Sequence, residues 1–502
     1  LQHCQLRFGS HGLLESFTGS WGELLAGQGE IVLQKSGKNV PLEPASQKLS
    51  QQGNSVRIDT RLGFEGGSLE VRAEVDFDGF TIYKLRIRDL PPDKIDGLSV
   101  QFPLRKEHAK FVHRMHVQST QGLTGVGWES KAGPLWLGGQ DGGLAFNFDV
   151  DPFLSTHRRS QLEVLEQGKQ TWLRVNFVDA PGQVTRQDHI FRFFLTPTPT
   201  KEPSLRKDGF FHTNIGGWFE NWSDYQGYPD LKKLPKVKEK ARAAHKEDGP
   251  FLVYFNMMLA ENAPGFARHR SELFIPPGLM WYKRDYNPGK GIPCWVCCTR
   301  GPYGDLLLDG MARLAEEGDV DGVYMDGTSL AWSCDSLAHG PCSVEELTWD
   351  EQQVTSLVGT RNFVKRIRGV FDAKGKAMLV AHNGGALQIE TLSLCDSFYE
   401  GEQLSDVRYC RGYRLPLHSA AVCYSGRPWG FRLDVLANMI RPRYMMAYAA
   451  LHDAEVSGCD ELEASVYGDF QDEETLYHPY WRSQPHVQHK KGEVLFSYYL
   501  NP

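Results

Sequence analysis

The chain has 502 residues with 55 basic and 62 acidic side chains, so its formal net charge is −7 and it is long enough for more than one domain. This acidic balance argues against a nucleic-acid-binding protein, which normally carries a basic patch or stripe. The sequence has no apolar run of about 18 residues, so no membrane span is predicted.

Residues 1–200 contain short alternating apolar and polar runs that are separated by glycine and polar turns. This spacing predicts an N-terminal antiparallel β-sandwich. Trp128 and Trp136 lie beside glycine turns, and we expect them to pack between the two sheets rather than stack on a ligand. The clearest runs are 55–62, 68–77, 81–88, 144–150 and 170–178.

A proline-rich segment at 197–203 marks a domain boundary, and strands alternate with helices beyond it. This alternation predicts a parallel sheet, and its length matches a (β/α)8 TIM barrel over residues 201–460. We expect residues 461–502 to form a small C-terminal β segment, truncated at the end of this sequence. The eight expected strands lie near 211–216, 251–257, 293–299, 322–326, 377–382, 397–402, 429–433 and 454–458.

Three amphipathic helices are predicted between these strands. Residues 232–246 are lysine-rich but have apolar residues on one face, which favours a helix on the outside of the barrel. Residues 305–318 begin at a possible cap, Asp305, and residues 348–370 begin with a capping box of Thr348 and Glu351.

Candidate catalytic acids follow two of the expected strands. Cleavage of a glycosidic bond requires two carboxyl groups, and catalytic residues of barrels lie at the carboxyl ends of strands. Asp326 ends the fourth strand, whereas Glu400 and Glu402 end the sixth and are two residues apart, which places them on one side of a strand. We predict Asp326 as nucleophile or stabiliser and Glu402 as acid/base, with Glu400 as a substitute for either. Salt bridges or turns are the structural alternatives.

The predicted substrate is an oligosaccharide or glycoconjugate, and polar and aromatic residues at other strand ends could bind it. His382 and Asn383 follow the fifth strand, although a structural hydrogen bond to a backbone carbonyl is an equal alternative for His382. Trp218, Trp222 and Asp224 follow the first strand and suit a sugar platform, unless the tryptophans are buried beneath the sandwich.

Nine of the ten cysteines lie after residue 290. Cys294, Cys297 and Cys298 fall in an apolar run that favours buried free thiols. Cys334 and Cys342 flank a histidine, and a disulfide, a metal site and two free thiols all remain open for them. The sequence shows no motif of a serine-hydrolase elbow, phosphate-binding Walker loop or zinc-protease helix, and we predict no cofactor and no metal.

Short motifs in order along nearly the whole chain resemble the bacterial proteins described as similar to glycoside hydrolase family 123. The motifs are Gly127-Trp128, residues 134–139, Tyr303-Gly304-Asp305, residues 321–327, His339-Gly340, residues 361–366, His382, Asp396 with Gly401-Glu402, and residues 478–481. The resemblance implies an N-terminal β-sandwich, a central (β/α)8 barrel, a C-terminal β-domain and glycosidase activity.

The resemblance also implies a mechanism for the family proper, which is exo-acting on β-N-acetylgalactosaminides and uses the substrate's own acetamido group beside adjacent Asp and Glu residues. The adjacent acidic pairs in this sequence depart from that pattern. Asp350-Glu351 falls at an expected helix start, Asp460-Glu461 follows the expected eighth strand, and Asp472-Glu473 falls in the C-terminal segment. A direct mechanism with two carboxylates therefore suits Asp326 and Glu402 better.

Two other functions stay open at this level. One is a carbohydrate-binding protein without catalysis, and the other is a polysaccharide lyase, which would use a Tyr or His base. Residue 1 is Leu and no signal-peptide pattern follows, so we expect either a mature or a trimmed form of the protein. The leading hypothesis is a secreted or periplasmic bacterial glycoside hydrolase. The sequence does not predict an oligomeric state.

Overall fold

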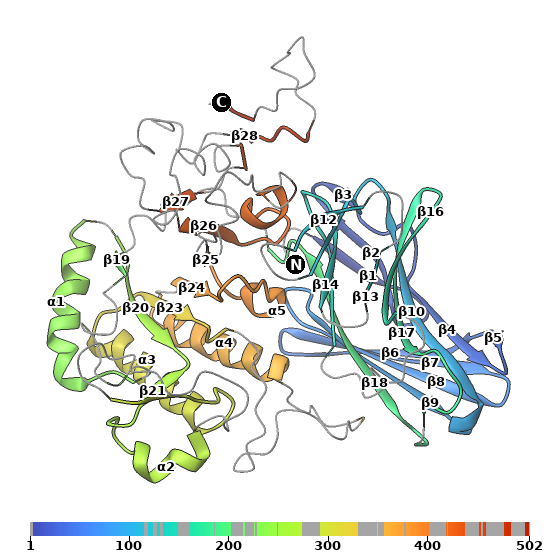
Figure 1. Cartoon of the computed structure of the whole chain (residues 1–502), viewed down its shortest axis with the longest axis horizontal. Coiled ribbons are helices and arrows are strands. Elements are labelled where there is room, and N and C mark those ends of the chain that lie inside the picture. Colours follow the sequence, from blue (N-terminus) through green and yellow to red (C-terminus); the bar gives the residue numbers. More distant parts are fainter. Residues whose placement is uncertain are drawn as a thin grey trace.

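A computed structural model gives the arrangement of the chain (Figure 1). The residues that it describes are 4–114, 119–123, 128–130, 134–148, 160–184, 186–201, 214–215, 225, 228–247, 249–273, 292–329, 349, 356–375, 378–400, 418, 420–436, 451–452, 455–457, 476–482 and 497–500.

The N-terminal part consists of antiparallel sheets of nine, six and three strands, all drawn on one side of the molecule in Figure 1. The nine-stranded sheet contains β6 (Glu43–Gln52), β7 (Ser55–Phe64), β8 (Gly67–Val75), β9 (Thr81–Arg88), β11 (Phe111–His113), β12 (Gln121–Gly122), β14 (Leu135–Gly138), β15 (Gly143–Asn147) and β18 (Ile190–Thr198). The six-stranded sheet contains β4 (Glu30–Lys35), β5 (Lys38–Val40), β10 (Ile95–Arg105), β13 (Trp128–Ser130), β16 (Leu162–Gln167) and β17 (Gln170–Val178). The three-stranded sheet contains β1 (Gln5–Phe8), β2 (Leu14–Gly19) and β3 (Gly22–Glu23), and the short helix η1 (Pro92–Lys94) precedes β10.

Alternation along the strands separates a buried core from a charged face. In β8, Leu69 and Val71 join a hydrophobic core shared by both large sheets. Glu70 and Arg72 alternate with them and point to the opposite face. The large antiparallel sheets expected from the sequence are therefore present.

Trp136 corrects one prediction made for this part. Its side chain is fully buried, but it belongs to the core of the following α/β part rather than to the core between the two sheets. Its ring centroid lies 4.7 Å from that of Trp429, and its indole nitrogen donates a hydrogen bond to Thr198. A tryptophan beside a glycine turn is large enough to reach past its own sheet, which the local pattern does not reveal.

Beyond residue 201, seven strands form one parallel sheet in the order in which they occur along the chain. They are β19 (Asn214–Ile215), β20 (Phe251–Asn256), β23 (Gly322–Asp326), β24 (Met378–His382), β25 (Ser397–Glu400), β26 (Arg432–Leu436) and β27 (Glu455–Ser457). The helices are η4 (Leu231–Lys233), α1 (Leu234–His245), α2 (Phe266–Leu273), α3 (Pro302–Glu317), α4 (Ser356–Asp372), α5 (Ile389–Leu392) and the π-helical turn η6 (Ala420–Tyr424). An antiparallel pair, β28 (Leu476–His478) and β29 (Tyr498–Leu500), lies near the C-terminus.

The strand expected near residues 293–299 was wrongly placed in the parallel sheet. Residues Cys294–Val296 form β22, which pairs antiparallel with β21 (Met258–Ala260) in a separate sheet. Strand β20 instead pairs directly with β23. Trp295 and Val296 are only half-buried, unlike the fully buried residues of β20, so this apolar run lacks the two covered faces of a central strand.

The helices begin later or earlier than their sequence signals indicated. Helix α1 is confirmed, with its apolar face buried. Helix α3 begins at Pro302 and places Asp305 in its first turn rather than at the cap. Helix α4 begins at Ser356, and the expected capping box at Thr348 and Glu351 lies outside the described residues.

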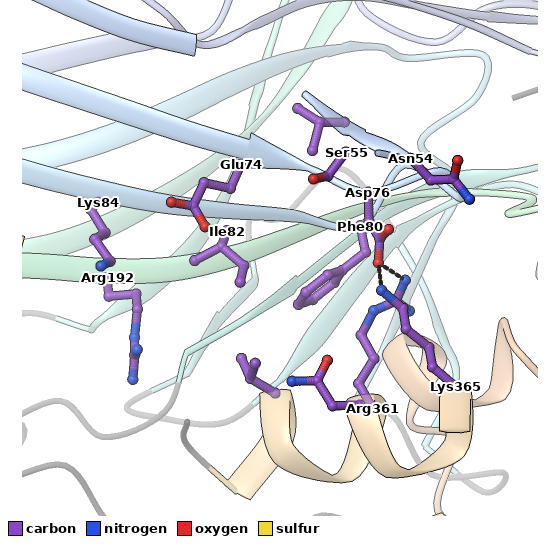
Figure 2. Close-up of a pocket in the computed structure, with 13 residues that line it drawn as sticks. Asn54, Ser55, Glu74, Asp76, Phe80, Ile82, Lys84, Arg192, Arg361 and Lys365 are labelled. Atoms are coloured by element: carbon purple, nitrogen blue, oxygen red, sulfur yellow. Dashed lines mark hydrogen bonds and ion pairs between the residues drawn. The ribbon is translucent and has the colours of Figure 1, made fainter. Parts of the chain in front are cut away.

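Helix α4 also connects the two parts of the molecule. The Arg361 guanidinium, which is 1% exposed, donates hydrogen bonds to Asp78 at 2.7 and 2.9 Å and to Asp76 at 2.6 Å. Both aspartates lie in the turn between β8 and β9, and Lys365 also pairs with Asp76 (Figure 2). A buried, multiply bonded guanidinium thus fixes the helix to the turn of the sandwich.

Candidate active site

Polar side chains form a row across the carboxyl ends of the central parallel strands. Asn256 pairs in register with Asp326, and Asp326 pairs with His382 on the next strand. Adjacent strands lie about 4.8 Å apart, so side chains in one row on one face are neighbours. The row therefore brings Asp326 and His382 together on neighbouring strands.

Among the described residues, the row lies on the face of the sheet opposite the one that the helices cover. Val323 and Met325 of β23 join the core formed with α1, α3 and α4. Tyr324 alternates with them and joins a separate small cluster with Tyr254 and Tyr399. Asp326 is two residues after Tyr324, so its side chain emerges on the tyrosine face.

Asp326 is held by a tyrosine of the neighbouring strand. The hydroxyl of Tyr254 donates a hydrogen bond to the Asp326 carboxylate, and the Tyr254 ring stacks on Tyr324 with a centroid distance of 5.4 Å. A hydrogen bond donated to a carboxylate stabilises its ionised form. Asp326 is partly exposed, so the same carboxylate can reach a ligand. An anionic carboxylate is what a nucleophile or an oxocarbenium stabiliser requires.

A second tyrosine orients His382. The Tyr324 hydroxyl lies 2.5 Å from Nδ1 of His382. Burial raises the pKa of Tyr324 well above its ordinary value, and the nearby charge of Asp326 adds to the shift. Tyr324 therefore keeps its proton near neutral pH and can donate it to Nδ1, which leaves Nε2 as the protonated nitrogen of a neutral ring. His382 thus has a side-chain partner where a backbone carbonyl was the structural alternative.

Glu400 is fully buried at the end of β25. Its Oε1 accepts hydrogen bonds from the backbone amides of Asn383 at 3.0 Å and Gly385 at 2.9 Å, and it lies 3.9 Å from Nε2 of His382. The carboxylate therefore fixes the loop that follows β24 and faces the imidazole. These contacts favour a positioning role over direct attack on substrate.

Asn383 and Asp434 are two further polar residues near the carboxyl ends of the parallel strands. The Asn383 side-chain oxygen accepts a hydrogen bond of 2.6 Å from the hydroxyl of Ser329, just after β23. Asp434 is in register with Tyr399, is fully buried and accepts a hydrogen bond from Ser397. Asp434 was not predicted as a site residue.

Four predicted site residues lie outside the described residues. They are Glu402, Trp218, Trp222 and Asp224.

The cysteines Cys334 and Cys342 also lie outside the described residues. Cys294, Cys297 and Cys298 are buried and form no disulfide bond, as predicted. Within the part of the chain that the structure describes, no three His, Cys, Asp or Glu side chains gather closely enough to hold a metal ion, and no helix is both long and apolar enough to cross a membrane.

The sequence contained a usable signal for the two tyrosines. Tyr254 and Tyr324 stand two residues before the last residue of their strands, Asn256 and Asp326, so alternation alone puts each tyrosine on the face of its strand's last residue. The contacts of the two tyrosines with each other and of Tyr254 with Asp326 depend on the direct pairing of β20 with β23. This pairing was not predicted, because the expected third strand was placed between them. Asp434 had the weaker signal of one acid within a short apolar run.

Comparison with known proteins gives one family match and several distant structural likenesses. The family model described as "Glycoside hydrolase 123, third domain" matches residues 12–163. No curated protein matches the sequence. Solved structures that resemble the fold include a GH31 family sulfoquinovosidase from E. rectale, with 11% identity and a TM-score of 0.41 over 91% of this chain and 78% of that chain. Another is an alpha-galactosidase from Thermus thermophilus, with 13% identity and a TM-score of 0.42 over 88% of this chain and 97% of that chain.

TM-scores below 0.5 leave the folds too different for these two likenesses to support an inference about this chain. The family match is independent of them and lies within the antiparallel sheets of the N-terminal part. It agrees with the resemblance carried by the sequence motifs. Residues 12–163 are therefore similar to the third domain of glycoside hydrolase 123.

Proposed function

We propose that the protein cleaves a glycosidic bond in a complex or host-type glycan, with catalytic carboxylates at the ends of the parallel strands. Asp326 acts as nucleophile or stabiliser, and Glu402 acts as acid/base. The observation that carries this proposal is the Asp326 carboxylate, which accepts a hydrogen bond from Tyr254 and lies beside His382 on the face opposite the described helices.

The reaction requires two carboxyl groups across the scissile oxygen. Asp326, which accepts the hydrogen bond of the Tyr254 hydroxyl, stabilises positive charge at the anomeric carbon or attacks it. Glu402 donates a proton to the leaving oxygen and then removes one from water. His382 and Asn383 bind sugar hydroxyls, Trp218 and Trp222 cover the apolar face of a sugar ring, and Asp224 accepts hydrogen bonds from hydroxyl groups.

Three further parts of the proposal concern the surroundings of the site. The seven parallel strands belong to a (β/α)8 barrel that closes around Asp326. The supporting feature is their strictly sequential order, which is that of a barrel. The substrate is an oligosaccharide or glycoconjugate, and the protein acts in polysaccharide degradation. The protein is secreted or periplasmic. Fractionation of producing cells tests the last point, and a signal confined to the cytoplasm would contradict it.

Hydrolysis of a broad glycan panel, followed by mass spectrometry, tests the activity and identifies the substrate. With that substrate, Asp326→Asn and Glu402→Gln should each lower kcat by about 10²–10⁴-fold. Glu316→Gln is the matched control, because Glu316 is an exposed acid on α3 that pairs with Lys374 at 3.3 Å. Wild-type rates in both variants would exclude these two residues as the catalytic pair.

The chemistry of the products separates the remaining mechanisms. Proton NMR of the first sugar released distinguishes retention from inversion, which correspond to carboxylate separations of about 5 Å and 6.5–9.5 Å. Products with an unsaturated, ultraviolet-absorbing end would instead indicate a polysaccharide lyase. In that reaction the Tyr324 and His382 pair would be the natural base.

A further inference from the structure

Two loops meet at the carboxyl ends of β23 and β24, which carry the candidate active site. The backbone amide of Gly327 donates a hydrogen bond of 2.7 Å to the carbonyl of His382. Two residues further on, the Ser329 hydroxyl donates a hydrogen bond of 2.6 Å to the side-chain oxygen of Asn383. Thr328 lies between these two contacts in the sequence, so the loops lie side by side at this residue.

The hydroxyl of Thr328 and the side-chain nitrogen of Asn383 are buried without a hydrogen-bond partner. Thr328 is 1% exposed and Asn383 is 4% exposed. Among the described residues, no group accepts a hydrogen bond from Nδ2 of Asn383, and none bonds to Oγ1 of Thr328. Most buried polar side chains have such a partner, because burial without one costs free energy. The two loops therefore hold unused hydrogen-bond donors next to the row of Asp326.

Ser329 determines which end of the Asn383 amide is unused. Because Oδ1 of Asn383 accepts the hydrogen bond of Ser329, the amide nitrogen faces a different direction. Ser329 is fully buried, and its carbonyl accepts a hydrogen bond of 2.7 Å from the Thr391 hydroxyl of α5. The backbone amide of Asn383 donates to Glu400 at 3.0 Å. Both partners of the side-chain contact are thus held in place, and Asn383 can offer only N–H groups to a ligand.

A hydroxyl without a partner does not by itself indicate a ligand site. Thr171 of β17 in the sandwich is also fully buried, and its hydroxyl has no partner among the described residues. The location of Thr328 distinguishes it, because Thr328 is two residues after Asp326, whose carboxylate is partly exposed. Asn383 directly follows His382, the in-register neighbour of Asp326. The unused donors therefore lie where the proposed substrate would bind.

We propose that Asn383 and Thr328 bind hydroxyl oxygens of the sugar unit next to Asp326, and that Ser329 is a positioning residue that makes the Asn383 amide a donor. The identity of the ligand as a sugar rests on the proposed function. Sugar hydroxyl oxygens are acceptors, which suits the N–H groups and the hydroxyl that the loops offer. A sugar that lacks the matching hydroxyl leaves a buried donor unpaired and is rejected. The sugar at this position therefore carries a free hydroxyl group.

Thermal unfolding of the full-length chain without any glycan tests the unused hydroxyl. Valine has nearly the shape of threonine, so Thr328→Val removes an unpaired buried group and should raise the Tm. Thr171→Val is the matched control and should do the same. Thr391→Val is the opposite control and should lower the Tm, because its hydroxyl is bonded to Ser329. An unchanged or lower Tm for Thr328→Val would show that its hydroxyl serves the fold, and would overturn the proposal.

Calorimetric titration tests the ligand. It uses the full-length Asp326→Asn protein, which should bind the glycan identified by the panel without cleaving it. Added Thr328→Val or Asn383→Asp should each weaken binding about tenfold or more, whereas added Thr171→Val should leave it unchanged. In Asn383→Asp the carboxylate still accepts the hydrogen bond of Ser329 but has no N–H group to donate. If Asn383→Asp does not fold, Thr328→Val decides alone.

Deoxy analogues of the bound sugar test the contact with Thr328 directly. One analogue that lacks a single hydroxyl should bind about tenfold more weakly than the parent sugar when Thr328 is present. In the Thr328→Val protein the same analogue should bind like the parent sugar, because the contact is already lost. If every analogue shows the same loss in both proteins, Thr328 contacts no sugar hydroxyl and the proposal is overturned.

A double mutant tests the positioning role of Ser329. Ser329→Ala should weaken glycan binding when Asn383 is present, because the amide is then free to turn. In the Asn383→Asp protein the same change should cause no further loss. A loss of equal size in both proteins would show that Ser329 only supports the loop, and would overturn its role as a positioning residue.

Failure of the proposed hydrolysis and failure of this inference give different results. A chain that binds a glycan of the panel without cleaving any would overturn the hydrolysis alone, and the same titrations then use the wild-type chain. Hydrolysis and binding that both survive Thr328→Val and Asn383→Asp would overturn the inference and leave the proposed function intact. A chain that binds no glycan of the panel would overturn both.

Discussion

The hydroxyl group of Tyr254 on strand β20 donates a hydrogen bond to the carboxylate of Asp326 on the adjacent strand β23. The two residues are 72 positions apart in the sequence and meet because β20 and β23 pair directly. Tyr254 thus forms part of the environment of Asp326, the proposed nucleophile or stabiliser. A hydrogen bond to a charged group contributes about 1.5–3 kcal/mol.

The Tyr254→Phe variant should retain the fold and lose this hydrogen bond. We expect kcat to fall by about 10–100-fold with little change in KM, because about 1.4 kcal/mol corresponds to a factor of ten and the bond stabilises charge on Asp326. Steady-state kinetics on the identified substrate measure the effect. Tyr228→Phe is the control, since Tyr228 also donates to an aspartate, Asp309, at 2.9 Å, but at the surface. Equal kinetics in both variants would contradict the role of Tyr254.

Glu400 distinguishes a positioning residue from an acid/base. A Gln at this position can still accept hydrogen bonds from the amides of Asn383 and Gly385, so Glu400→Gln should stay within a few-fold of wild-type kcat. Glu400→Ala should destabilise the fold, because each buried amide left without its acceptor costs about 1–3 kcal/mol. A loss of about 10²–10⁴-fold in kcat for the Gln variant would instead identify Glu400 as an acid/base.

Arg361 should dominate the stability of the contact between the two parts of the molecule. Arg361→Ala leaves the buried carboxylate of Asp78 without its cation, and we expect a loss of about 3–5 kcal/mol in the free energy of unfolding. Arg366→Ala on the same helix is the control. Its pair with Asp305 is exposed, with side-chain exposures of 58% and 70%, and is worth about 0–1 kcal/mol. Urea unfolding measures both values, and equal losses would contradict the assignment.

Lys84 should make stability depend on alkaline pH. Because its pKa is lowered to about 8 in the folded protein from an ordinary value of 10.5, the unfolded chain binds more protons between these values. The free energy of unfolding of the wild type should therefore rise relative to that of Lys84→Met as pH increases from about 8 toward 10.5, and the full penalty remains below about 8.

Urea unfolding at several pH values between 7 and 10 measures this difference. Lys48→Met provides the control, because Lys48 is exposed on β6. A difference between wild type and Lys84→Met that stays constant with pH would show that Lys84 keeps an ordinary affinity for its proton in the folded state.

The sequence predicted those features that depend on local periodicity. The apolar positions of α1 and the strand ending at Asp326 follow directly from spacing and turn residues. The placement of β22 outside the parallel sheet depends on which strand pairs with its neighbour, which no local pattern encodes. The same limitation hid the site partners, because the contact of Tyr254 with Asp326 and that of Tyr324 with His382 both arise from register between distant strands.

The burial of Trp136 was predicted, whereas its location was not. The apolar run of β14 indicates only that the Trp136 side chain is covered, and the covering group is Trp429 from a segment almost 300 residues later. A charged row of Arg72, Lys84 and Arg192 crosses three strands and could be found from sequence only after β8, β9 and β18 had been aligned in register. Features set by local sequence propensity were therefore predicted, whereas features that depend on pairing between distant segments were not.

The contact of Arg361 with Asp76 and Asp78 bears on how this enzyme can be dissected or recombined. A fragment beginning after the sandwich would have Arg361 without its two counterions, and it would expose the apolar indole of Trp429 that Trp136 covers in the whole chain. Such a fragment should be insoluble when produced by itself. Exchange of the sandwich for that of another protein would succeed only if the incoming turn supplied two acids at the same spacing.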